Sequence, residues 1–255
     1  MLRLCALLLC LALPTLAQTA RAQTAPPETA HPKTALAAVA ANFADTAKAL
    51  AAQFQRETGQ EVQITTGSTG KLYAQITQGA PFDLMLSADA EAPARLHEAG
   101  HGTPQPYATG ILTLWVPGQP AGSPPAALLQ DNSIRHIAIA NPALAPYGKA
   151  TVTALQAMGL DAALKDKIVM GQNIGQAFAL VQSGAAEAGF IARSALPAQA
   201  NGYVWDVTPS LYPPIRQDAI LLQHGAENPA ATAFLAFLGT PSARALIVQS
   251  GYGLP

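Results

Sequence analysis

Residues 67–70, with the sequence Gly-Ser-Thr-Gly, combine side chains and backbone that can bind an anion. They separate a strand-like run, residues 62–66, from a helix-like run that begins at Lys71. The hydroxyls of Ser68 and Thr69 and several free backbone N–H groups would gather at a helix N-terminus, where the helix dipole favours negative charge. The pattern predicts an oxyanion site, although the same sequence also occurs as an ordinary turn or helix cap.

Three further strand-to-helix turns carry residues of the same kind. They are Asn42 after the run 35–41, the proline-containing loop 141–148 after the run 134–140, and Asn173 before the helix-like run 174–183. Asn42 has Asp45 three residues on, in the manner of a capping box, so it can cap its helix or direct its amide N–H into a cleft. The N–H groups of Ile174 and Gly175 would point out of the helix that Asn173 begins.

The elements that position these turns follow one pattern. Short apolar runs alternate with helix-length amphipathic runs, which is typical of an α/β fold with mostly parallel sheets. Ligands in such folds bind at the carboxyl ends of the strands. Four donor-bearing turns, two in each half of the chain, therefore predict a binding cleft between two lobes.

The composition excludes some classes of partner. The chain has a formal net charge of −1, 11% charged residues and no cluster of Lys or Arg, which argues against nucleic acid or an anionic membrane surface. A small anion remains possible, because a few aimed dipoles can hold one without formal positive charge. Cys5 and Cys10 are the only cysteines and lie in the N-terminal segment, so we expect no disulfide or thiolate metal site in the mature chain.

Residues 1–22 have the pattern of a cleavable secretory signal. Arg3 is followed by an apolar stretch, and residues 20–22 form an Ala-Arg-Ala cleavage site, with cleavage after Ala17 as an alternative. Residues 23–33 are then expected to form a disordered leader. No later apolar run approaches the ~18 residues that span a bilayer. These features predict a protein exported to the periplasm.

Taken together, the chain resembles the periplasmic molybdate-binding proteins of ABC importers, a branch of the two-lobed solute-binding proteins. The resemblance covers essentially all of residues 34–255. The segments that carry it are Ala40-Ala41-Asn42-Phe43, Gly67-Ser68-Thr69-Gly70-Lys71-Leu72, Gln75-Ile76, Gly79-Ala80-Pro81-Phe82-Asp83, Leu86-Ser87-Ala88-Asp89, Ile139-Ala140-Asn141-Pro142, Ala145-Pro146-Tyr147-Gly148, Asn173-Ile174-Gly175-Gln176-Ala177, Gly184-Ala185-Ala186, Gly189-Phe190 and Gly251-Tyr252.

This resemblance implies an α/β fold of two lobes, each a mostly parallel sheet flanked by helices. Lobe one would combine residues 34–109 with 216–255, and lobe two would hold residues 110–215. Segments 110–116 and 219–222 would cross between the lobes as a hinge. The resemblance further implies a monomeric, non-enzymatic protein without cofactor or metal cation, which binds molybdate, and also tungstate, and delivers it to the membrane permease of an ABC importer.

The resemblance also implies a set of anion contacts, with side-chain donors at the first two turns and backbone N–H groups at the last two. Carried over to this chain, the contacts are Asn42 with the neighbouring Ala41, Thr69 supported by Ser68, the N–H of Tyr147 and the N–H of Ile174. Asn42 stands where many members have Ser, and Ala192 stands where some have Tyr, as in a subgroup with Asn at the first turn. The ranking of molybdate, tungstate and sulfate therefore stays open.

A site made only of hydrogen-bond donors suits molybdate, tungstate and sulfate, because these ions are fully deprotonated at neutral pH and only accept hydrogen bonds. Phosphate keeps a proton near pH 7 and would need an acceptor such as a carboxylate. Lys71 is a further candidate counter-charge, although a residue in the first helical turn more often points to solvent. The alternative within this fold is a protein for sulfate or another small anion.

An enzymatic alternative has one motif behind it. His97-Glu98-Ala99-Gly100-His101 satisfies the H-E-x-x-H pattern of zinc metallohydrolases. That chemistry needs both histidines on one face of a continuous helix, whereas Gly100 and the Gly-Thr-Pro at residues 102–104 indicate a helix end. A serine hydrolase built on Ser68 would lack the G-x-S-x-G turn.

Overall fold

The computed structural model describes residues 34–197 and 199–255, all of which fall in a single compact unit. The predicted signal, residues 1–22, and the predicted leader, residues 23–33, lie outside the described residues.

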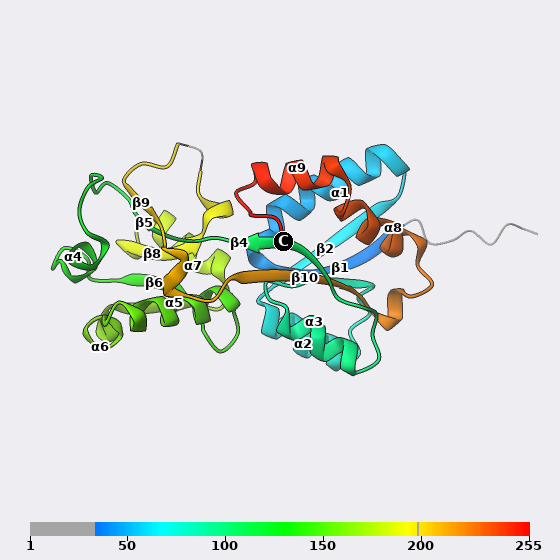
Figure 1. The fold of residues 1–255 in the computed structure, drawn as a ribbon, viewed down its shortest axis with the longest axis horizontal. Coiled ribbons are helices and arrows are strands. Elements are labelled where there is room, and N and C mark those ends of the chain that lie inside the picture. Colours follow the sequence, from blue (N-terminus) through cyan, green and yellow to red (C-terminus); the bar gives the residue numbers. More distant parts are fainter. Residues whose placement is uncertain (1–33, 198) are drawn as a thin grey trace, which may run out of the picture. The chain divides into compact units, whose positions relative to one another are not determined.

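Strands and helices alternate along most of the chain (Figure 1). The strands are β1 (Thr34–Ala40), β2 (Glu61–Gly67), β3 (Leu84–Leu86), β4 (Gln105–Gly110), β5 (Leu112–Val116), β6 (Ile137–Ala140), β7 (Ile168–Gly171), β8 (Ala188–Ala192), β9 (Tyr203–Asp206) and β10 (Ile215–Leu221). The helices are α1 (Ala44–Thr58), α2 (Thr69–Thr77), α3 (Glu91–Glu98), α4 (Pro125–Gln130), α5 (Pro146–Ala157), α6 (Asp161–Leu164), α7 (Ile174–Gln182), α8 (Pro229–Leu238) and α9 (Pro241–Gln249). Short 3-10 helices include η1 (Ala41–Phe43) and η3 (Arg193–Ala195).

The strands form two separate five-stranded sheets, and each sheet is the centre of one lobe. The sheet of lobe one has the order β2-β1-β3-β10-β4, in which β1 runs parallel to β2 and β3 while β10 is antiparallel to both its neighbours. The sheet of lobe two has the order β7-β6-β8-β5-β9, with β6 parallel to β7 and β8 and β5 antiparallel to its neighbours. The predicted α/β fold with two lobes is confirmed.

The chain crosses between the two sheets twice. The first crossing is Ile111, between β4 and β5; it lies within the predicted segment 110–116, but residues 112–116 of that segment are paired in the sheet of lobe two. The second runs through residues 207–214, between β9 and β10. The prediction that residues 219–222 cross is therefore wrong, because Ala219 pairs with Leu86 inside the sheet of lobe one. An apolar strand buried on both faces has the same composition as a buried crossing segment, so the sequence pattern did not distinguish them.

The alternation of side chains along β1 explains how lobe one is layered. Ala35, Ala37 and Val39 contact one hydrophobic cluster with residues of α1, α8 and α9, and Ala38 contacts another with residues of α2 and α3. Successive side chains of a strand point to opposite faces, so helices cover both sides of the sheet, as Figure 1 shows. This packing fixes the helices that begin at the carboxyl ends of β1 and β2.

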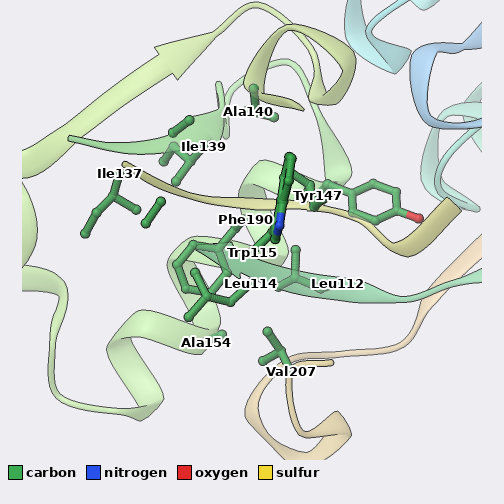
Figure 2. Packing of buried hydrophobic residues seen from close by; sticks show 14 of the residues in the cluster. Leu112, Leu114, Trp115, Ile137, Ile139, Ala140, Tyr147, Ala154, Phe190 and Val207 are labelled. Carbon is green, nitrogen blue, oxygen red and sulfur yellow. The ribbon is translucent and has the colours of Figure 1, made fainter. Parts of the chain in front are cut away.

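Lobe two has one large core around its sheet. Figure 2 shows part of it, with Leu112 and Leu114 of β5 beside Phe190 of β8, while the ring of Tyr147 extends away from these side chains and carries its hydroxyl outward. Within the described residues no single helix is long and apolar enough to cross a membrane; α8 and α9 pass that test only as a pair bent by 66°.

Candidate functional site

The four predicted turns meet around one small cavity between the lobes. The space inside it measures about 10 Å³ for the centre of a water-sized sphere, which is about the room for one water molecule and too little for a sugar or a peptide. The lining residues are Ala40, Ala41, Asn42, Gly67, Ser68, Thr69, Ala88, Ala145, Pro146, Tyr147, Asn173 and Ile174. All six residues that the sequence named as anion contacts are among them. That they bind an anion stays a prediction.

Larger hollows occur elsewhere on the described surface, for example one of about 660 Å³ beside Arg193 and Gln249. The residues lining that hollow include a carboxylate, Asp206, and no first residue of a long helix. The small cavity is the stronger candidate, because four helix N-termini reach it and each provides N–H groups that the helix itself does not use.

Ser68 and Thr69 form the wall contributed by the second turn. Ser68 has extended backbone angles, φ −70° and ψ 148°, and precedes the first residue of α2, yet its side chain does not cap the helix. Its buried Oγ has no hydrogen-bond partner among the described residues. The Oγ1 of Thr69 accepts a hydrogen bond from the N–H of Ala88 at 3.2 Å, so its own proton remains available to a ligand. This wall therefore offers two hydroxyl donors.

The first turn differs from the sequence expectation in the direction of the Asn42 side chain. Its Nδ2 donates to Oε1 of Gln217 at 3.0 Å and to the hydroxyl of Tyr252 at 3.3 Å. An amide nitrogen has two hydrogens, so both are engaged away from the cavity. Asn42 also makes no side-chain cap with the 3-10 helix in which it lies. The prediction of Asn42 as a side-chain donor is thus corrected: this turn offers the backbone N–H groups of Ala41 and Asn42.

Lobe two contributes backbone groups through the N-termini of α5 and α7. Pro146 is the first residue of α5 and has no N–H, so Tyr147 has the first available donor, while the N–H groups of Gly148 and Lys149 both bond to the carbonyl of Ala145 at 2.9 and 3.1 Å. The first turn of α5 packs closely against the end of β6, because a Cβ on Gly148 would lie 2.3 Å from the carbonyl oxygen of Ala140.

At α7, Asn173 acts as the predicted cap. Its Oδ1 accepts from the N–H of Gln176 at 3.0 Å, and its carbonyl accepts from the N–H of Ala177 at 3.2 Å. These bonds satisfy the N–H groups of the third and fourth residues of the helix. The N–H groups of the first two residues, Ile174 and Gly175, are not used by the cap. Ile174 is itself among the residues that line the cavity.

Formal charges are kept away from the cavity, since its lining contains no charged residue among those the structure describes. The nearest carboxylate in sequence, Asp89, accepts from the Ser87 hydroxyl and from the N–H of Ala92, both at 3.0 Å. Burial raises the pKa of Asp89 above its ordinary value. Lys71 is exposed and is not part of the lining. The cavity therefore offers a ligand backbone and side-chain dipoles and, within the described residues, no formal counter-charge.

The two lobes contact each other around the cavity. The N–H of Gly70 in lobe one donates to the carbonyl of Leu144 in lobe two at 2.9 Å. The Ser194 hydroxyl of lobe two donates to the carbonyl of Asn42 at 3.2 Å. These bonds join the two lobes on two sides of the cleft.

The zinc motif does not assemble a site in the structure. Helix α3 ends at Glu98, between the two histidines, and Gly100 has φ 94°. His97 Nδ1 lies 3.0 Å from the carbonyl of Gly102, and His101 Nδ1 accepts from the N–H of Gln223 at 3.0 Å. Within the described part of the chain, no three His, Cys, Asp or Glu residues form a group that could hold a metal ion.

Comparison with known proteins agrees with this geometry. The family described as bacterial extracellular solute-binding protein matches residues 35–253. The chain is 43% identical to the molybdate-binding protein ModA of Rhodobacter capsulatus over 220 residues, which are 85% of this chain and 87% of the relative. It is equally 43% identical to ModA of Azotobacter vinelandii over 223 residues, 85% of this chain and 88% of that protein. The chain belongs to the molybdate-binding branch of the bacterial extracellular solute-binding family.

Solved structures show the same fold for this solute-binding protein. The periplasmic molybdate-binding protein of Azotobacter vinelandii superposes with a TM-score of 0.82 at 37% sequence identity, covering 87% of this chain and 99% of that one. The sulfate-binding protein SubI of Mycobacterium tuberculosis superposes with a TM-score of 0.70 at 17% identity, covering 86% of each chain. At that level of identity the second likeness concerns the fold alone.

Sequence reasoning missed the residues behind the first turn of this solute-binding protein. Tyr107 and Gln217 are fully or almost fully buried, and the Tyr107 hydroxyl donates to Gln217 Oε1 at 3.0 Å. Gln217 is 175 residues from Asn42 in the sequence. The local sequence carried no signal for Gln217, because it stands between Arg216 and Asp218 in β10 and such a polar run is typical of an exposed segment.

Proposed function

We propose that this protein binds molybdate, and with it tungstate, in the cavity between the lobes and delivers the ion to the membrane permease of an ABC importer. The contacts would be the hydroxyls of Ser68 and Thr69 and the N–H groups of the turn at Ala41 and Asn42, of Tyr147 and of Ile174. The 43% identity to two molybdate-binding proteins supports the choice of ion. The ion is the only ligand required, and no catalytic step is involved.

The observation that carries the proposal is a small cavity where four helix N-termini meet, with the buried hydroxyl of Ser68, unpaired within the described part of the chain, at its wall. A buried polar group without a partner costs about 1–3 kcal/mol, and Ser68 Oγ is such a group among the described residues. An oxygen of a bound dianion would satisfy it. Hydrogen bonds to charged groups contribute about 1.5–3 kcal/mol each, so several together hold a small ion firmly without any cation.

The same donor set supports discrimination by protonation state. Molybdate, tungstate and sulfate accept hydrogen bonds at every oxygen, whereas a phosphate that keeps a proton needs an acceptor. The lining residues that the structure describes include no carboxylate. Phosphate would therefore leave a buried O–H unpaired, and such mismatches reduce binding strongly. Sulfate is smaller than molybdate and would be distinguished by its fit in the cavity alone. A difference in fit separates ligands less strongly than an unpaired buried O–H group does.

Delivery to a permease would use the closed arrangement of the lobes. Closure about the two crossing segments buries the ion and presents one defined shape to the membrane protein, a hinge motion of the usual kind. We further propose that residues 1–22 form a signal that is cleaved on export and that the mature protein acts in the periplasm as a monomer.

Calorimetric titration of the exported, mature protein with molybdate, tungstate, sulfate and phosphate tests the proposal. We expect molybdate and tungstate to bind with a stoichiometry of one, sulfate to bind at least tenfold more weakly, and phosphate to give no measurable heat. Sulfate binding as tight as molybdate would overturn the choice of ion. The mass of the mature chain checks the cleavage site in the same preparation.

A further inference from the structure

A buried polar network lies behind the first turn of the cavity. Gln217 of β10 is its centre, because Oε1 of this side chain accepts from Asn42 at 3.0 Å and from Tyr107 at 3.0 Å. The Tyr252 hydroxyl in turn donates to the carbonyl of Asn42. All four residues belong to lobe one and are buried. The network holds the turn that begins η1 in place.

Two polar atoms at this network have no hydrogen-bond partner among the described residues. One is Gln217 Nε2 in lobe one, and the other is the hydroxyl of Tyr147 in lobe two. Gln217 has no exposed surface and Tyr147 is 1% exposed. An amide N–H donates and a phenol oxygen accepts, so the two atoms are complementary. Leaving both unpaired is costly in a buried position.

Gly110 shows that these two atoms are neighbours. A Cβ on this residue would lie 2.3 Å from the Tyr147 hydroxyl oxygen and 2.8 Å from Gln217 Nε2. Gly110 ends β4 directly before the first crossing between the lobes. Burial raises the pKa of Tyr147 well above its ordinary value, and the amides of Gln217 and Asn42 are close enough to oppose that shift. The hydroxyl of lobe two thus enters a space that the missing side chain of Gly110 leaves open.

We propose that Gln217 Nε2 donates a hydrogen bond to the Tyr147 hydroxyl when the lobes close on the bound ion, so that Tyr147 and Gln217 are positioning residues for closure. The inference rests on the proposed function. Tyr147 has its N–H at the cavity wall and its hydroxyl at the network of lobe one, so one residue connects the ion with the crossing segment. A shift of the α5 N-terminus toward the ion would bring this cross-lobe pair, Gln217 and Tyr147, into bonding distance.

Tyr147→Phe is the direct test, because it removes the hydroxyl and keeps the ring and the backbone N–H. We expect molybdate affinity to fall about fivefold to tenfold, carried by faster dissociation rather than slower association. Stopped-flow fluorescence with Trp115 and Trp205 as reporters measures both rates. Tyr203→Phe is the matched control: this buried tyrosine of lobe two pairs with Val116, at the end of β5 away from the crossing, and its loss should leave both rates unchanged.

A double-mutant cycle separates a specific pair from general loosening. Gln217→Met also removes the contacts to Asn42 and Tyr107, so we expect weaker binding from it alone, and no further loss when Tyr147→Phe is added. Additive losses would overturn the cross-lobe pair. An unchanged dissociation rate in Tyr147→Phe would overturn it while leaving the proposed function intact, whereas failure of the unmutated protein to bind molybdate would overturn both.

Gly110→Ala provides a second route if Gln217→Met does not fold. Its methyl group would occupy the space of the Tyr147 hydroxyl and oppose closure, so we expect weaker binding. Removing that hydroxyl makes room, and Tyr147→Phe should then restore part of the affinity in the Gly110→Ala background. Absence of any restoration would count against the cross-lobe pair.

Discussion

The two walls of the cavity differ in what they offer an anion. Lobe one contributes the hydroxyls of Ser68 and Thr69 at its second turn, next to a first turn that a buried polar network supports from behind. From lobe two we expect backbone donors, the N–H groups of Tyr147 and Ile174, two of the residues that line the cavity. A hydroxyl can be removed by one substitution, whereas a backbone N–H can only be displaced with its helix. Changes in lobe one should therefore alter affinity in steps of one hydrogen bond, and changes in lobe two should act through geometry.

The backbone donors of lobe two are best tested at Gly148. A Cβ there would lie 2.3 Å from the Ala140 carbonyl oxygen, so Gly148→Ala must move the start of α5, at a strain of about 1–3 kcal/mol. We expect molybdate affinity to fall by on the order of a hundredfold, because misplaced donors lose their alignment. Calorimetry measures the loss, and circular dichroism checks that the variant is folded.

Gly175→Ala is the matched control at the other helix of lobe two. Its Cβ would meet two side-chain atoms, Oδ1 of Asn173 at 3.2 Å and Cβ of Ala41 at an ordinary 3.9 Å, and a side chain yields more easily than backbone. Affinity within about threefold of the unmutated protein is expected. Equal losses in the two variants would show that α5 has no special position within the wall of lobe two.

Local sequence patterns were sufficient to predict the four turns but not the network behind them. Residues 67–70 follow a parallel strand, and the carboxyl ends of parallel strands meet at one sheet edge, so the convergence of such turns could be predicted. Asn42 illustrates a feature that could not be predicted from local sequence. Its amide direction depends on Gln217 and Tyr252, which are 175 and 210 residues away in the sequence, and no local propensity reports contacts of that separation.

On the opposite wall, Thr69→Ala should have the next largest effect. The Thr69 hydroxyl accepts from the N–H of Ala88 at 3.2 Å and has a proton to give to the ion, so its removal affects both the protein and the ligand. We expect an affinity loss of at least ~1 kcal/mol together with a lower melting temperature. Thr69→Ser keeps the hydroxyl and should retain most of the affinity. Unchanged binding by Thr69→Ala would exclude Thr69 as a ligand.

Ser68→Ala tests the second hydroxyl of the same wall. Ser68 Oγ neither caps α2 nor bonds to any described residue, so its loss should leave the ligand-free protein as stable as before, or slightly more so. We expect about fivefold weaker molybdate binding with a melting temperature unchanged to within about 2 °C. A marked drop in the melting temperature of the ligand-free protein would indicate a structural role for Ser68 instead.

The smallest effect is expected from Lys71, the cation that directly follows residues 67–70 in the sequence. Lys71 is exposed and absent from the cavity lining, so its charge acts on a dianion only through solvent, where exposed interactions contribute ~1 kcal/mol or less and are screened within about 8 Å at physiological salt. Lys71→Met should therefore weaken molybdate binding less than about twofold at 0.15 M salt, and mainly by slowing association. Lys48→Met, on α1 and paired with Asp45 at the surface, is the matched control for loss of one positive charge. If Lys71→Met instead lowers affinity tenfold at high salt while Lys48→Met does not, the wall of lobe one holds the ion by charge as well as by dipoles.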